Sequence, residues 1–195
     1  MALSPQNAGS RDRSVALLVL PDPSGRNPTA ETQALVQQVA GGLRARRYRV
    51  VLAGVESSGA VEDLSAAANS AGVDLVIGMR VLSKSEPCGA ILTPDRVPMP
   101  PVPKEPVSQS DLGVYVRQIA SFQRAEASRR AAQLAGAISS SARACSRKPT
   151  ELEHYVLDSC LGPTVLLTIS PKDEKTFAER LPAIVAEWLG KEGAA

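Results

Sequence analysis

The sequence is poor in histidine, aromatic residues and cysteine. It holds one histidine, and aromatic residues make up 3% of a chain whose net charge is +2. Without a stacking surface or a strongly basic face, nucleic acid is not an expected partner. The three cysteines, Cys88, Cys145 and Cys160, show no CxxC spacing. This pattern supports neither a zinc cluster nor a full disulfide framework, although one disulfide between two of the three cysteines stays possible.

Long apolar runs are also missing. Pro21 interrupts the early run Val15–Leu20 before it reaches the roughly 7–15 residues of a signal-peptide core. No later segment approaches the roughly 20 apolar residues that span a bilayer. We therefore expect no signal peptide and no transmembrane segment. The compartment stays open between the cytoplasm and export with removal of a leader, and no cofactor is expected.

What the chain does contain is a succession of short apolar runs and amphipathic stretches. With 195 residues and 44% hydrophobic content, it is long enough for one domain with a substantial core. The alternation predicts one α/β domain over residues 15–192, with a mixed, mainly parallel sheet and helices on both faces, after a disordered leader over residues 1–14. The expected strands are Val15–Leu20, Tyr48–Leu52, Val73–Ile77, Cys88–Leu92, Tyr155–Leu157 and Gly162–Pro171.

The expected helices follow from apolar residues at helical spacing. Thr29 or Thr32 is the expected N-cap of the first helix, and Gly41 and Gly42 weaken its end. Ser110–Ser141 is the longest helical candidate. In the C-terminal helix, Pro182 is expected to start or kink the helix.

Residues 93–108 form a proline-rich insertion in this domain. We expect them to be extended and exposed, because proline fits neither a helix interior nor a sheet ladder. Their PxxP spacings suit an SH3-like reader. A plain linker is the favoured interpretation, because such motifs also arise freely in proline-rich insertions.

Polar residues follow three of the expected strands. Asp22 and Ser24 come after the first strand, Arg80 follows the third, and Thr168 lies near the end of the late strand. The carboxyl ends of parallel strands meet at one edge of a sheet, where open α/β folds place their sites. These four residues are therefore expected to line a polar cleft. For the loop with Asp22 and Ser24, an ordinary turn is the competing interpretation.

A second set of reactive residues is His154, Asp158 and Cys160. Their spacing would suit thiol catalysis if they shared one strand face. Structural or surface roles are favoured instead, because a catalytic thiol needs a base and an oxyanion site that the sequence does not display.

Three blocks of the sequence resemble one enzyme family. Residues 67–80 are similar to the family block LANEAGADLFISIH, residues 155–169 to YVLRNTKMPAVLVEL, and residues 19–25 to IDPGHGG. The family is the zinc-dependent N-acetylmuramoyl-L-alanine amidases, which cut peptidoglycan between the muramic acid lactyl group and the stem peptide. The resemblance implies an amidase-type, phosphorylase/hydrolase-like fold and a role in the cell wall.

The resemblance also implies where a zinc site would lie. In the family, zinc is held by a His of the opening motif, a Glu early in the first helix and a His after the third strand, and a Glu after the late strand is the general base. At the matching positions this chain has Ser24-Gly25, Pro28 or Glu31, Arg80 and Thr168. A catalytic zinc takes three protein ligands from His, Glu, Asp or Cys, and a guanidinium repels the cation. We therefore expect no bound metal.

From this mismatch we expect a pseudoenzyme. It would be a catalytically inactive, amidase-like domain that binds a peptidoglycan fragment or a protein of the cell-wall or division machinery, as a binding or regulatory module. Asp22, Ser24, Arg80 and Thr168 would line its vestigial cleft, with no catalytic residue among them. The alternatives are a divergent active amidase, a thiol hydrolase, or a scaffold that works through the proline-rich insertion and the long helix.

Overall fold

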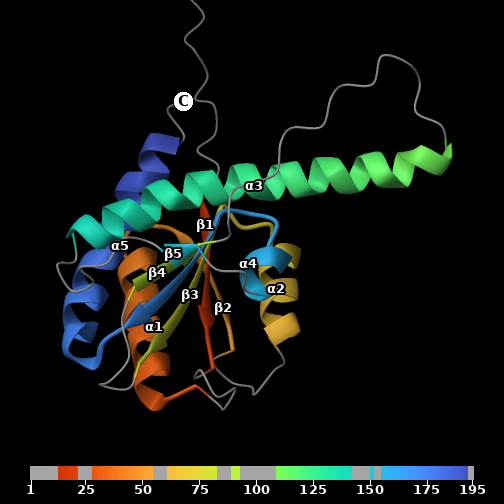
Figure 1. Ribbon diagram of the computed structural model, residues 1–195. Coiled ribbons are helices and arrows are strands. Elements are labelled where there is room, and N and C mark those ends of the chain that lie inside the picture. Colours follow the sequence, from red (N-terminus) through yellow and green to blue (C-terminus); the bar gives the residue numbers. More distant parts are fainter. Residues whose placement is uncertain are drawn as a thin grey trace, which may run out of the picture.

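Six strands form one sheet in the order β2-β1-β3-β6-β4-β5 (Figure 1). The computed structural model describes residues 13–21, 28–54, 61–82, 89–92, 109–141, 150–151 and 155–192. The strands are β1 (Ser14–Val19), β2 (Arg49–Ala53), β3 (Leu75–Val81), β4 (Gly89–Leu92), β5 (Thr150–Glu151) and β6 (Thr164–Ile169). Ser14, expected at the end of the leader, is a buried residue of β1.

The helices are α1 (Ala30–Arg44), α2 (Val61–Ser70), α3 (Gln109–Ser141), α4 (Tyr155–Ser159) and α5 (Glu174–Glu192), with a 3-10 turn η1 (Pro171–Asp173) before α5. Helices thus alternate with strands along most of the chain. This order confirms the predicted α/β domain. None of the helices in the described ranges combines the length and apolar character needed to cross a membrane.

Four neighbouring strands of the sheet are parallel. β1 pairs with β2 and with β3, and β3 pairs with β6, all in parallel register. β4 runs antiparallel to β6 and parallel to β5, which makes the sheet mixed. The ends of β1, β3 and β6 therefore meet at one margin, here called the carboxyl edge, and their starts meet at the opposite margin, the amino edge.

One face of the sheet packs against α1, α3 and α5 (Figure 1). Strand side chains alternate between faces, so every second residue of β3, from Leu75 through Ile77 to Val81, belongs to this core. Its helical partners include Leu35 of α1 and Phe177 of α5. Burial of these apolar surfaces is the main force that holds the three helices to the sheet.

The other face packs against α2 and α4. Its core is smaller and joins Leu18 and Leu166 of the sheet to Leu64 of α2 and Val156 of α4. Both faces of the central strands are thus covered, which is why β1 and β6 are buried at every position and mainly apolar rather than alternating.

A glycine allows α1 and α5 to approach each other closely. A Cβ added at Gly42 would lie 2.6 Å from Cγ of Pro182 and 3.0 Å from its Cβ. Pro182 lies inside α5 rather than at its start. The glycine that weakens α1 locally therefore makes room for the proline ring of the neighbouring helix.

The strand predicted over Tyr155–Leu157 is wrong, because these residues begin helix α4. A run of three residues is too short for its period to distinguish a strand from a helix. The end of α4 is held by a distant side chain. Asn69 donates to the carbonyl of Ser159 at 2.8 Å and accepts from the amide of Leu161 at 2.9 Å.

The proline-rich insertion predicted over residues 93–108 lies outside the described ranges, as does the predicted disordered leader except for Arg13 and Ser14.

Candidate active site at the carboxyl edge

Arg80 and Thr168 lie side by side at the carboxyl edge. They are direct partners in the parallel register of β3 and β6. By strand alternation both project toward the face that α2 and α4 cover. Two of the four residues predicted for the cleft are therefore neighbours, whereas the other two, Asp22 and Ser24, lie outside the described residues.

Thr168 ties β6 to the start of β4. Its hydroxyl accepts from the amide of Gly89 at 2.9 Å and lies 3.1 Å from the Gly89 carbonyl, to which it donates. The residue is buried. These contacts place the Thr168 side chain between two strands, where its hydroxyl bridges the antiparallel pair.

Arg80 places a cation at this edge. The side chain is partly buried, and its Nε has no hydrogen-bond partner among the residues that the structure describes. A buried donor without a partner is costly. The guanidinium is always charged and presents its donors in a planar fork that fits a carboxylate. Arg80 is therefore suited to bind an anionic group at the end of β3.

The start of α1 is fixed to the end of β3. Thr29 caps the helix, and its Oγ1 accepts from the amide of Thr32 at 3.2 Å. Thr32 in turn accepts from the amide of Val81 through its own Oγ1, at 2.9 Å in a buried contact. This pair of hydroxyls holds the first turn of α1 at the carboxyl edge, and with it the exposed side chain of Glu31.

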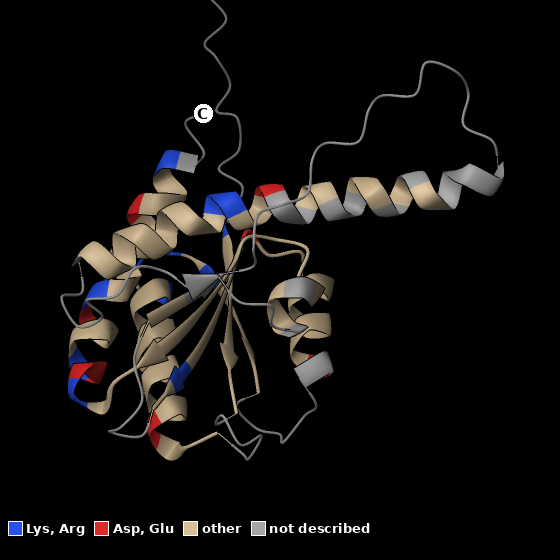
Figure 2. Ribbon diagram, in the orientation of Figure 1, with Lys and Arg blue, Asp and Glu red and all other residues tan. Residues whose placement is uncertain are grey.

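A second glutamate reaches this edge from the chain after β6. The turn η1 follows β6, and Glu174 is the first residue of α5. Burial, and then the negative charge of Glu31, raise the pKa of the Glu174 carboxyl. The two carboxylates are therefore close enough to interact. Figure 2 shows acidic segments near the starts of α1 and α5.

Asp173 adds a third carboxyl group next to Glu174. Its Oδ2 is buried without a hydrogen-bond partner among the described residues. The start of α5 therefore concentrates acidic groups at the carboxyl edge.

Neither Glu174 nor Asp173 was among the predicted site residues. The resemblance matches Thr168 to the glutamate of the family's late strand, whereas Glu174 lies six residues further along the chain. The charged segment directly after the late strand was the signal that could have found it.

The zinc site that the sequence resemblance implies does not fit the described residues. They contain no group of three His, Cys, Asp or Glu side chains that could hold a metal. Arg80, a permanent cation, occupies the position that matches a zinc-binding His of the family.

Cys160 does not have the properties of a catalytic thiol. It is buried in the core between the sheet and the helices α2 and α4. Burial raises the pKa of its thiol to about 11, although a hydrogen bond with Thr164 acts in the opposite direction. The nucleophile is the thiolate, which this environment disfavours at neutral pH. The side chains of His154 and Asp158 lie outside the described residues.

The fold of the chain is that of an α/β domain of the amidase type. The sequence itself matches no family model and no curated protein. Among solved structures, it is similar to the N-acetylmuramyl-L-alanine amidase Ami1 from Mycobacterium smegmatis, with a TM-score of 0.60 and 14% identity over 92% of this chain and 97% of that chain.

Two clostridial structures show the same likeness. One is the N-acetylmuramoyl-L-alanine amidase from Clostridium difficile 630, with a TM-score of 0.58 and 13% identity over 93% of this chain and 98% of that chain. The other is the CwlD amidase from Clostridioides difficile, solved in complex with the GerS lipoprotein, with a TM-score of 0.56 and 8% identity over 91% and 98%. At such identities the likeness concerns the fold.

These matches contradict the prediction that the chain is not an enzyme. Several solved structures that share its fold over nearly their whole length are amidases. The prediction took the mismatch at the zinc-ligand positions as a sign of inactivity. A hydrolytic site can be built from other groups, and acidic groups do gather at the carboxyl edge.

Proposed function

We propose that this chain is a divergent peptidoglycan hydrolase of the amidase fold, with its reaction centre at the carboxyl edge. One observation carries the proposal: Glu31 in the first turn of α1 and Glu174 at the start of α5 both lie at the carboxyl edge, where burial and then the charge of Glu31 raise the pKa of Glu174. The match to amidases over nearly the whole chain supports peptidoglycan as the substrate class.

Two carboxyl groups in different surroundings can divide acid and base roles. In the proposed reaction, the Glu31 carboxylate takes a proton from a water molecule, whose oxygen attacks the amide carbon of the substrate. The Glu174 carboxyl, which keeps its proton to a higher pH, gives that proton to the amide nitrogen as the C–N bond breaks. The products are a carboxylic acid and an amine, and both glutamates exchange protons with solvent afterwards.

Arg80 and Thr168 would position the substrate in this proposal. Peptidoglycan stem peptides carry carboxylates, and the guanidinium of Arg80 can hold one of them through two parallel hydrogen bonds. Thr168 lies beside it in register. Asp22 and Ser24 follow β1 in the sequence and are proposed, on that ground alone, to line the same cleft.

The test is release of a stem peptide from an N-acetylmuramoyl peptide, followed by mass spectrometry. We expect the parent to turn the substrate over, and Glu174→Gln and Glu31→Gln each to lower kcat by roughly 100-fold or more, the usual loss for a general acid or base. Turnover should fall as the pH rises through the raised pKa of Glu174, and a chelator should leave it unchanged.

Glu187→Gln is the matched control. Glu187 lies in the same helix as Glu174, on an exposed position paired with Lys191, and its loss should not change turnover. Absence of turnover in the parent, or equal turnover in Glu174→Gln and Glu187→Gln, would refute the proposed reaction.

A further inference from the structure

The turn between α1 and β2, here called the basic turn, carries four arginines within six residues. They are Arg44, Arg46, Arg47 and Arg49, and all four are exposed. The turn lies at the amino edge, because β2 begins at Arg49 and runs parallel to β1. It is therefore at the opposite end of the parallel strands from Glu31 and Glu174, and the proposed reaction does not use it.

The backbone of the basic turn is strained at Arg47. The Tyr48 amide donates to the carbonyl of Leu43 at 3.2 Å, and the Arg47 amide donates to the carbonyl of Arg44 at 2.9 Å. This pair of bonds forms a Schellman motif, whose left-handed position is usually a glycine. Here it is Arg47, with a φ of 65°, the one non-glycine residue of the described ranges that has a positive φ. Strain at an exposed, charged residue is typical of functional positions.

Two of the four guanidinium groups are held in place by the fold. Arg46 Nη1 donates to the carbonyl of Gly42 at 2.9 Å, and Arg49 Nη2 donates to the carbonyl of Ala71 at 2.8 Å. Because these acceptors are neutral, the bonds fix the side chains and leave their charge uncompensated. Within the described ranges, no ion pair involves any of the four arginines.

Two carboxylates on this side of the molecule are bound to other groups. Oδ2 of Asp74 accepts from the amide of Ser14 at 2.8 Å. Glu187, in the second half of α5, forms an ion pair with Lys191 at 2.7 Å. The basic turn therefore presents a net positive charge to solvent, although the net charge of the whole chain is only +2.

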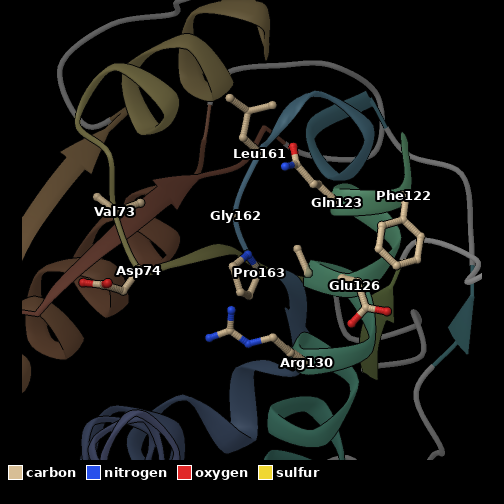
Figure 3. A pocket seen from close by; sticks show the side chains of 10 residues that line it. Val73, Asp74, Phe122, Gln123, Glu126, Arg130, Leu161, Gly162 and Pro163 are labelled. Carbon is tan, nitrogen blue, oxygen red and sulfur yellow. The ribbon is translucent and has the colours of Figure 1, made fainter. Parts of the chain in front are cut away.

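The exposed surface of the basic turn is charged rather than apolar. Its large apolar side chains face inward: Leu43 is fully buried, and Tyr48 packs against the same core. The pocket in Figure 3 lies elsewhere on the amino edge, where Arg130 of α3 extends beside Pro163, and none of the four arginines lines it (Figure 3). The basic turn thus lacks the apolar centre that is typical of a protein interface.

The amino edge also carries exposed apolar side chains. The described residues expose three large hydrophobic side chains, of which Leu161, 62% exposed, lies in the loop before β6. The other two, Val114 and Val116, are 46% and 54% exposed on α3, the helix that lies along this edge. Residues two apart on a helix do not share a face, so these side chains form no contiguous patch. Single apolar side chains along a basic edge suit insertion among lipid headgroups.

We propose that the amino edge docks on a bilayer with anionic headgroups, through the basic turn. A guanidinium binds phosphate oxygens through two parallel hydrogen bonds. Each basic residue near an anionic bilayer strengthens binding by about fivefold, and the resulting association is reversible and sensitive to salt. In this orientation the carboxyl edge faces away from the bilayer. The proposal does not depend on the reaction at that edge.

The probe is a vesicle of equal parts phosphatidylglycerol and phosphatidylcholine, sedimented with the full chain. We expect the parent to bind these vesicles at least about tenfold more tightly than vesicles of phosphatidylcholine alone. Raising the salt concentration from about 0.1 M to about 1 M shortens the Debye length from about 10 Å to about 3 Å and should release the protein. Equal binding to the neutral vesicles, or binding that persists at the higher salt concentration, would overturn the proposal.

Arg47→Gly separates the charge of this residue from its backbone strain. Glycine adopts the left-handed conformation without strain, so Tm should rise by about 2–4 °C. Binding to the anionic vesicles should nevertheless fall about fivefold, because one charge is lost. Lys175→Gln is the matched control. It removes one positive charge from an exposed residue of α5 at the carboxyl edge, and should leave binding within about twofold of the parent.

Unchanged vesicle binding in Arg47→Gly, or an equal loss in Lys175→Gln, would contradict a docking surface at the amino edge. A soluble polyanion is the competing partner for a cluster of arginines. If the parent binds inorganic polyphosphate more tightly than the anionic vesicles at equal phosphate concentration, the bilayer is not the partner and the proposal is overturned.

Discussion

The contact between Gly42 and Pro182 predicts that alanine substitutions at the neighbouring residues Gly41 and Gly42 change the stability of the fold differently. Gly41 and Gly42 both lie in α1 near its end. A Cβ added at Gly41 meets nothing within 4 Å, whereas one added at Gly42 lies 2.6 Å from Cγ of Pro182. Alanine is favoured over glycine in a helix interior by about 1 kcal/mol, and this gain applies at both positions.

At Gly42 the gain is opposed by overpacking. Real Cβ atoms essentially never lie as close to another heavy atom as 2.6 Å, and the proline ring cannot rotate away as a flexible side chain would. The helices α1 and α5 must separate, and inserting a carbon into a packed contact typically costs about 1–3 kcal/mol. We therefore expect Gly41→Ala to stabilise the fold by about 1 kcal/mol. Gly42→Ala should leave stability unchanged or lower it by up to about 2 kcal/mol.

Thermal unfolding distinguishes these outcomes, because 1 kcal/mol shifts Tm by about 2–4 °C in a domain of this size. The Pro182→Ala variant is a further test. It removes the Cγ atom at 2.6 Å and keeps the Cβ atom at 3.0 Å, so Gly42→Ala should be less destabilising in this background than in the parent, and the double-mutant cycle isolates the ring contact. An equal rise in Tm for Gly41→Ala and Gly42→Ala in the parent would refute the close approach of the two helices.

Three further predictions concern single side chains. Folding raises the pKa of Glu174, so the ionised carboxylate destabilises the fold. Glu174→Gln should therefore raise the free energy of unfolding at pH values above that pKa, and this gain should vanish as the pH falls below the ordinary glutamate range. A gain in urea unfolding that does not depend on pH would contradict this prediction. Thr32→Val should cost about 1–3 kcal/mol in urea unfolding, because the buried amide of Val81 loses its acceptor, and an unchanged midpoint would be inconsistent with that bond. Cys160, 2% exposed, should react with a thiol reagent only after denaturation, and rapid labelling of this residue in the folded protein would show otherwise.

The sheet and its main helices could be predicted because their signals are local. β1 and β6 are mainly apolar runs, and the cap of α1 is a threonine in a sequence with helical spacing. Helix α4 could not be predicted in this way. Its end depends on the side chain of Asn69, which reaches it from the end of α2. No pattern near Tyr155 carries that information.

The candidate site depends even more on distant contacts. Thr168 occupies the strand position at which the resemblance places a glutamate. Its hydroxyl bonds to Gly89 of β4, and this partner is in place only once the sheet has assembled. The glutamate of this edge comes after η1, where the chain turns back to begin α5, and its pKa depends on Glu31 of another helix. A sequence motif specifies residues at fixed spacing along the chain, whereas a catalytic acid and base need only lie close together in the folded protein. A mismatch at the motif positions therefore cannot by itself show that the edge lacks catalytic groups.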